Sequence, residues 1–159
     1  MHTDDLGARV SGLTTAAIHP SDSTVQSHAE TVIVQALALT RGVDIAPARI
    51  HLPDGSHVQV DGLAEDASVI VEAFARQTAF KAGQLHKVRA DMLKLALLRQ
   101  LPAYADTELV IALASPAALA SVAGWAAYAA DTFGITVELV QVPDLLREQI
   151  LQRQGDQYR

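Results

Sequence analysis

Acidic side chains with the chemistry of cation ligands lie in one stretch of the sequence, between His57 and Lys94. Asp61 ends a segment that alternates apolar and polar residues, and Glu72 follows the apolar run Val69–Val71. Two carboxylates from neighbouring strands can hold a divalent cation such as Mg²⁺ or Mn²⁺, because hard cations take oxygen ligands and commonly keep waters and a substrate phosphate as the others. Asp61 and Glu72 are therefore the candidate metal ligands.

A helix predicted over about 82–100 brings cations to the same stretch. Four of its polar residues recur at steps of three and four and so share one stripe: Gln84, Lys87, Asp91 and Lys94. An ammonium group near a phosphate offsets the charge that builds on the phosphorus oxygens during hydrolysis. Lys87 and Asp91 also have the spacing of an ordinary helical ion pair.

Both acids have structural interpretations as well. Asp61 precedes Gly62, as a turn residue does. Glu72 follows a buried run, where a charge is costly unless it is paired, and Arg76 or Lys87 is its expected partner.

Size and composition limit the classes of protein that the chain can form. It has 159 residues, half of them apolar, which suits one globular domain with its own core. It has no cysteine, which excludes disulfides, thiolate zinc sites and cysteine nucleophiles, and its six histidines show no ligand spacing. No apolar run reaches the roughly 20 residues of a membrane span, and Asp4 and Asp5 do not suit a signal peptide. We expect a cytoplasmic protein without a membrane segment.

The net charge of −6 conceals a basic segment. Between Arg76 and Arg99 six cations stand against Asp91 alone, so the segment carries +5 and the rest of the chain −11. A polyanion such as DNA, or an acidic partner, is expected to meet the basic helix at 81–99. A solvated helix face is the structural alternative.

Hydrophobic periodicity and turn signals predict alternating helices and strands in one α/β domain over 23–159, after a flexible N-terminal arm over 1–22. The order αβββαβαβα predicts a mixed central sheet flanked by helices. The expected helices are 24–40, 82–100, Ser115 to Gly134 and Asp144 onward, and the expected strands are 48–52, 57–61, 68–75, 108–113 and 135–142.

Three local patterns add detail to this outline. Ser27 followed by Glu30 fits a capping box, which places the firm start of the first helix there. Alternation puts Val58 and Val60 on a buried face and Asp61 on the opposite face, unless a bulge intervenes. Gly62 is expected in the turn that follows.

The helix after Ser115 is rich in alanine, and Trp125 and Tyr128 supply most of its bulk. Small residues allow close approach to a sheet or to another subunit. Both aromatic residues are therefore interpreted as contacts in the core or in a homodimer or larger assembly.

The order of elements resembles a known fold. The helix–strand–strand–strand–helix–strand order over about 24–113, with Asp61 closing the second strand and Glu72 on the third, is similar to the restriction-endonuclease-like fold of the PD-(D/E)xK nuclease superfamily. The run Val71–Gln77 and the helix start Lys81–Gln84 also resemble small uncharacterised bacterial proteins of that fold. The resemblance implies that Asp61 and Glu72 ligate Mg²⁺ and that the domain hydrolyses phosphodiester bonds in DNA.

The catalytic lysine of that superfamily falls on Phe74, two residues after Glu72, and a phenyl ring cannot activate water. Some relatives draw the ammonium group from the following helix, which implies Lys81 or Lys87 here.

Helicase-associated relatives carry a helical Gln-h-x-x-Tyr motif. Gln84 and Leu85 match its first two positions, and Val88 replaces the tyrosine. The resemblance implies that Gln84 orients the substrate and that Glu30 corresponds to an acid that some members contribute from the first helix. Capping is the structural interpretation of Glu30.

Three hypotheses fit these residues. The first is a Mg²⁺-dependent nuclease acting on DNA. The second is a catalytically inactive member of the same fold that serves as a binding or assembly subunit, which Phe74 in the lysine position favours. The third is an unrelated α/β scaffold in which both acids are structural.

Overall fold

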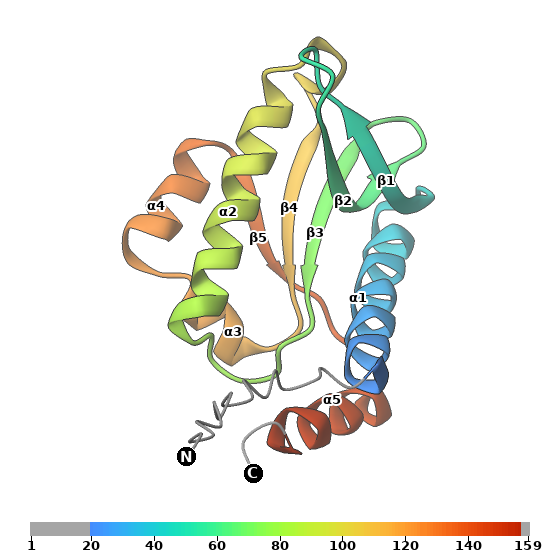
Figure 1. Cartoon of the computed structure of the whole chain (residues 1–159), viewed down its shortest axis with the longest axis vertical. Coiled ribbons are helices and arrows are strands. Elements are labelled where there is room, and N and C mark those ends of the chain that lie inside the picture. The colour runs from blue at the N-terminus through green and yellow to red at the C-terminus, as the bar shows by residue number, and fades with distance from the viewer. Residues whose placement is uncertain (1–19, 157–159) are drawn as a thin grey trace, which may run out of the picture.

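A five-stranded mixed sheet forms the centre of the structure (Figure 1). The computed structural model describes residues 20–156. The elements are α1 (Pro20–Arg41), β1 (Ile45–His51), β2 (His57–Ala64), β3 (Val69–Phe74), α2 (Ala82–Arg99), a 3₁₀ turn η1 (Pro102–Tyr104), β4 (Glu108–Leu113), α3 (Pro116–Ser121), α4 (Gly124–Thr132), β5 (Ile135–Leu139) and α5 (Asp144–Asp156).

The strands lie in the sheet in chain order, β1-β2-β3-β4-β5. β1 pairs with β2 and β2 with β3 in antiparallel fashion, whereas β3–β4 and β4–β5 are parallel. Parallel neighbours require crossover connections, and α2 and the α3–α4 pair supply them. The α/β class and the mixed sheet predicted from the sequence are confirmed.

Helices cover both faces of the sheet and bury a separate apolar cluster on each. Ile33 and Leu37 of α1 share one cluster with Val71 of β3, and α5 packs beside α1. Leu95 of α2 shares the other cluster with Ile70 of β3. Successive residues of β3 therefore face opposite helices, as expected for a strand buried on both faces.

The first helix begins earlier than its sequence pattern suggested. α1 starts at Pro20, so the predicted capping box at Ser27 and Glu30 is wrong: both residues lie inside the helix. Thr31 Oγ1 donates a hydrogen bond to the Ser27 carbonyl at 2.9 Å, and Gln26 Nε2 donates to Glu30 Oε1 at 3.2 Å. Residues 20–22 of the predicted arm belong to α1, and residues 1–19 lie outside the described residues.

The predicted alanine-rich helix is two helices. Ser115 caps α3, because its side chain accepts a hydrogen bond from the Ala118 amide at 3.1 Å. The chain then turns before α4, where Gly124 adopts φ of +60°, a conformation that breaks a continuous helix. Trp125 and Tyr128 are 64% and 76% exposed, so their interpretation as core residues is wrong. Their role in a subunit contact stays a prediction.

The sequence pattern left open whether a bulge lies near Asp61, and β2 contains one. Opposite the single residue Pro47 of β1, β2 supplies two residues, Asp61 and Gly62. Gly62 was expected in a turn, but β2 continues to Ala64. The extra residue breaks the strict alternation of faces at Asp61.

Gly62 is placed where no side chain fits. A Cβ atom added to it would lie 2.5 Å from Ile45 Cγ2 and 2.6 Å from Val71 Cγ1. Both contacts are with buried side chains of the neighbouring strands. The bulge therefore depends on a residue without a Cβ atom.

We expect Gly62→Ala to lower the free energy of unfolding by about 1–3 kcal/mol through overpacking. The matched control is Gly83→Ala on α2, where an added Cβ meets nothing within 4 Å. It should change stability little or raise it by up to about 1 kcal/mol, because alanine favours helix. Urea denaturation of both variants measures the difference, and equal stabilities would contradict the tight fit at Gly62.

Candidate functional site

The strands β2 and β3 part where the two predicted metal ligands lie. Their ladder contains the pairs Gly62–Val71 and Leu63–Ile70, and its register would next set Asp61 opposite Glu72. Instead, Asp61 Oδ2 accepts a hydrogen bond from the Ala73 amide at 2.8 Å. A side-chain carboxylate thus takes the place of a backbone acceptor, and a fork opens between the strands.

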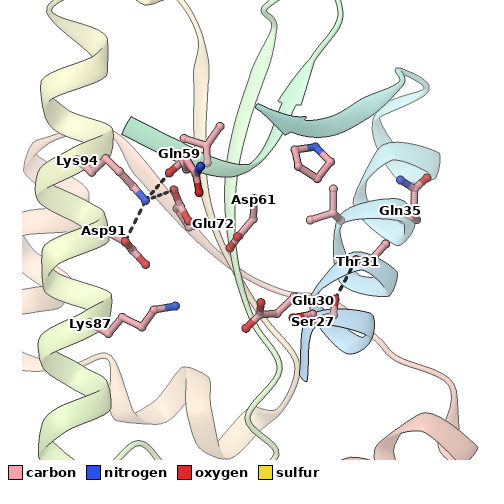
Figure 2. A pocket seen from close by; sticks show the side chains of 13 residues that line it. Ser27, Glu30, Thr31, Gln35, Gln59, Asp61, Glu72, Lys87, Asp91 and Lys94 are labelled. Atoms are coloured by element: carbon pink, nitrogen blue, oxygen red, sulfur yellow. Dashed lines mark hydrogen bonds and ion pairs between the residues drawn. The ribbon is translucent and has the colours of Figure 1, made fainter. Parts of the chain in front are cut away.

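A pocket of about 360 Å³ lies at this fork, between α1 and α2 (Figure 2). Its uncharged lining includes Ser27, Thr31, Gln35 and Gln59. Its charged lining comes from four elements: Glu30 on α1, Asp61 on β2, Glu72 on β3, and Lys87, Asp91 and Lys94 on α2. The structure therefore brings Asp61 and Glu72 into one pocket, as the sequence predicted.

Glu72 is 3% exposed and is paired with Lys94 rather than with the expected Arg76 or Lys87. The Lys94 Nζ atom lies 2.6 Å from Glu72 Oε1. Glu72 pairs with α2 because it lies on the same face of β3 as Ile70 and Phe74, and this face packs against α2. Arg76 instead donates from Nε to its own loop, at the Ala79 carbonyl 3.0 Å away.

Lys94 also binds two further oxygens. Its Nζ atom lies 3.2 Å from Asp91 Oδ1 and donates a hydrogen bond to the Gln59 carbonyl at 2.8 Å. The acceptors come from α2 and β2, and Glu72 adds one from β3. This single ammonium group joins the helix to both arms of the fork (Figure 2).

Burial controls the ionisation of the pocket. The pKa of Glu72 is raised to about 8, mainly by burial and further by the charges of Asp61 and Asp91, against the lowering effect of the Lys94 ammonium. Burial by itself lowers the pKa of Lys94, but Glu72 and Asp91 reverse this, and its pKa is raised. Burial also raises the pKa of Glu30. Lys94 therefore stays charged, and Glu72 is the group that titrates near neutral pH.

One buried carboxylate oxygen has unused capacity. Asp91 Oδ2 accepts no hydrogen bond within the described part of the chain, whereas Glu72 Oε1 is engaged by the Lys94 ammonium at 2.6 Å. Buried polar atoms are nearly always satisfied in native proteins, by protein, water or an ion. The pocket therefore retains an oxygen ligand atom for a cation or water.

Lys87 brings a second ammonium group to the pocket. Its Nζ atom lies 4.9 Å from the ring centroid of Phe74, within the range of a cation–π contact. Phe74 lies where the resemblance described above predicts a lysine, so an ammonium group lies over this residue although its own side chain carries no charge. The Asp91 carboxylate, expected to pair with Lys87, pairs with Lys94.

Lys81 and Gln84 lie at the start of α2 and are not part of the pocket lining. Gln84 Oε1 accepts a hydrogen bond from the Lys81 amide at 2.8 Å, which caps the helix. Of the predicted catalytic residues, the structure places Lys87 alone beside Asp61 and Glu72.

Lys94 and Asp91 are the site residues that the sequence did not assign. The signal was present, because both share the stripe of Lys87 along α2. Their assignment needed the register of α2 against β3, which sets Lys94 rather than Lys87 against the buried Glu72.

The basic segment does not form one cationic face. The Arg89 guanidinium lies 4.6 Å from the Trp125 ring centroid. Arg99 donates to the carbonyls of Phe133, Thr107 and Gly134 and so fastens α2 to the start of β4 and β5. These arginines hold the fold together, and the cations that reach the pocket are Lys87 and Lys94. Contact of DNA with 81–99 stays a prediction.

Within residues 20–156, no group of three or more His, Asp or Glu side chains is arranged to hold a metal ion. Over the same range, no helix has the length and apolarity to cross a membrane. Comparison with family models, curated proteins and solved structures finds no match to this chain. The pocket's own residues must therefore supply the evidence for its chemistry.

Glu72 should make stability depend on pH. Its pKa is about 8 in the folded protein against an ordinary 4.5, so between these values the folded state holds a proton that the unfolded chain has lost. The stabilisation of the folded state by this proton is complete below about pH 4.5 and disappears as the pH rises through 8. We expect Glu72→Gln to gain stability relative to the wild-type protein as the pH rises across this window.

Urea denaturation at several pH values measures this difference. Glu65→Gln is the control, because Glu65 is exposed and lies outside the pocket lining. A constant difference between Glu72→Gln and wild type over the window would contradict the buried titration of Glu72.

Proposed function

We propose that the fork pocket is the active site of a Mg²⁺-dependent nuclease that hydrolyses phosphodiester bonds in DNA, in a fold of the restriction-endonuclease-like kind. One observation carries the proposal: adjacent strands deliver Asp61 and Glu72 to a single pocket that also receives ammonium groups from α2.

The atoms that could ligate a metal ion in this pocket suit Mg²⁺ or Mn²⁺. The charged lining offers only carboxylate oxygens, from Glu30, Asp61, Glu72 and Asp91, and no sulfur or imidazole. With all groups ionised, these four carboxylates and two ammonium groups give a net charge of −2, which complements a divalent cation. Mg²⁺ needs only one or two carboxylates beside waters and substrate phosphate, so the lack of a three-ligand cluster in the described residues does not conflict with it.

Asp61 and Glu72 would hold the ion from the two arms of the fork. When bound, it would polarise the phosphodiester and acidify a water. The Ala73 amide fixes the Asp61 carboxylate, and the Lys94 ammonium fixes that of Glu72. Such bonds hold a ligand in one orientation before substrate arrives.

Lys87 supplies the positive charge that meets the substrate in this scheme. Its side chain points into the pocket between α2 and α1 (Figure 2), and the residue is exposed to solvent. An ammonium group so placed can contact a phosphate oxygen and stabilise the charge that develops during attack. Lys94 is already held by three oxygens and serves mainly to position Glu72.

The order of elements also supports the proposal. α1, β1, β2, β3, α2 and β4 follow one another as the resemblance to PD-(D/E)xK nucleases implies, with Asp61 on β2 and Glu72 on β3. The following elements, α3 to β5, extend this core by a parallel strand.

A binding or assembly subunit of the same fold is the second candidate. Phe74 leaves the lysine position uncharged, and the pairing of Glu72 with Lys94 lets the carboxylate be buried without a metal ion. This function would use the pocket surface and the flanks of α2, and it would not require hydrolysis.

Incubation of the protein with single- and double-stranded DNA and Mg²⁺ or Mn²⁺ tests the proposal. We expect metal-dependent cleavage that falls by about 10²-fold or more in Asp61→Asn and Glu72→Gln, the size of effect seen when one group that stabilises a transition state is removed. Glu65→Gln should cleave like the wild-type protein.

Metal binding is measured separately by the melting temperature, since an ion that binds only the folded state stabilises it. A rise with Mn²⁺ that Asp61→Asn abolishes, without cleavage of any DNA, would favour the inactive subunit. No rise and no cleavage would contradict the nuclease proposal.

A further inference from the structure

The Lys94 ammonium group is surrounded as a bound cation would be. Its Nζ atom has three oxygen neighbours: Glu72 Oε1 at 2.6 Å, the Gln59 carbonyl at 2.8 Å and Asp91 Oδ1 at 3.2 Å. They belong to β3, β2 and α2, so three elements of the pocket converge on this one charge (Figure 2).

The neighbours are ligands that hard metal ions prefer. Two are carboxylates and one is a backbone carbonyl, the set that binds Ca²⁺ and, with waters, Mg²⁺. Asp91 is 9% exposed, and its buried Oδ2 atom accepts no hydrogen bond in the described structure. The set thus holds at least one more oxygen than Lys94 uses.

We infer that Lys94 occupies a latent divalent-cation site, formed by Glu72, Asp91 and the Gln59 carbonyl, and acts there as a built-in cation. The tethered charge makes an ion at this position unnecessary. The proposed active site would then take one metal ion, between Asp61 and Glu72. This last consequence rests on the proposed function, whereas the latent site does not.

Removal of the charge should expose the site. Lys94→Met keeps an unbranched apolar side chain but leaves Glu72 and Asp91 without the ammonium group that joins them. Without it, Glu72 either keeps its proton or exchanges it for a cation, because metal binding releases protons from its ligands. The vacated position should therefore attract a divalent ion, and more strongly as the pH rises. Metal–oxygen distances of about 2.0–2.6 Å are shorter than those to Lys94, so the three ligands need to move inward only slightly.

Titration with Mn²⁺, followed by calorimetry and by the electron paramagnetic resonance of the free ion, counts the ions per chain. We expect Lys94→Met to bind one ion more than the wild-type protein, and this extra ion to raise its melting temperature. Asp91→Asn in the Lys94→Met background should remove the extra ion.

Lys87→Met is the matched control. It removes one ammonium group from the same pocket, but Lys87 lies over the Phe74 ring and not among the three oxygens. A gain of one ion in Lys94→Met alone supports the latent site. An equal gain in both variants would show a general effect of charge and overturn it.

Equal ion counts in Lys94→Met and the wild-type protein would also overturn the inference. Should Lys94→Met not fold without metal, Lys94→Gln removes the same charge and takes the same test. Failure of the nuclease proposal looks different: the wild-type protein would then cleave no DNA, and Lys94→Met would still bind one ion more than the wild-type protein.

Discussion

The burial of a carboxylate on a central strand is the constraint to which the rest of the site conforms. Glu72 lies between apolar neighbours on β3 at 3% exposure, close to the charges of Asp61 and Asp91. A buried charge without a partner is among the most costly features a fold can contain. Lys94 compensates it and binds the Gln59 carbonyl at the same time. The packing of α2 against the sheet is therefore coupled to the ionisation of the pocket.

The second feature of the site is the point at which β2 and β3 stop pairing. The bulge opposite Pro47 turns Asp61 out of the regular alternation, and Gly62 lets the strands approach where a Cβ atom would collide. The Ala73 amide then binds the Asp61 carboxylate instead of a backbone carbonyl. Because the acids are carried by strands rather than by loops, their separation is fixed by the backbone of the sheet.

The sequence predicted the α/β class, the mixed sheet and the convergence of Asp61 and Glu72, because adjacent strands set neighbouring residues side by side. It did not predict Lys94 as the partner of Glu72, since that depends on how far α2 slides along the sheet. Local patterns misled where two structures share one signature. Gly62 suits both a turn and a bulge, and Ser27 followed by Glu30 occurs inside helices as well as at their starts. The break before α4 spans Val122, Ala123 and Gly124, of which Gly124 alone has positive φ, in an otherwise favourable helical run.

The distribution of charge favours the pocket over the surface of α2 as the place of contact with a polyanion. Arg89 and Arg99 are engaged with the fold, and Lys87 is an exposed cation of the basic segment that lines the pocket. The chain as a whole carries −6, and its repulsion of DNA is screened only beyond about 8 Å at physiological salt. A divalent ion held by Asp61 would change this balance, because it attracts the acidic pocket and the phosphate alike. Under the proposed function, substrate affinity therefore depends on metal more than on basic side chains, and loss of the ion weakens binding as well as hydrolysis.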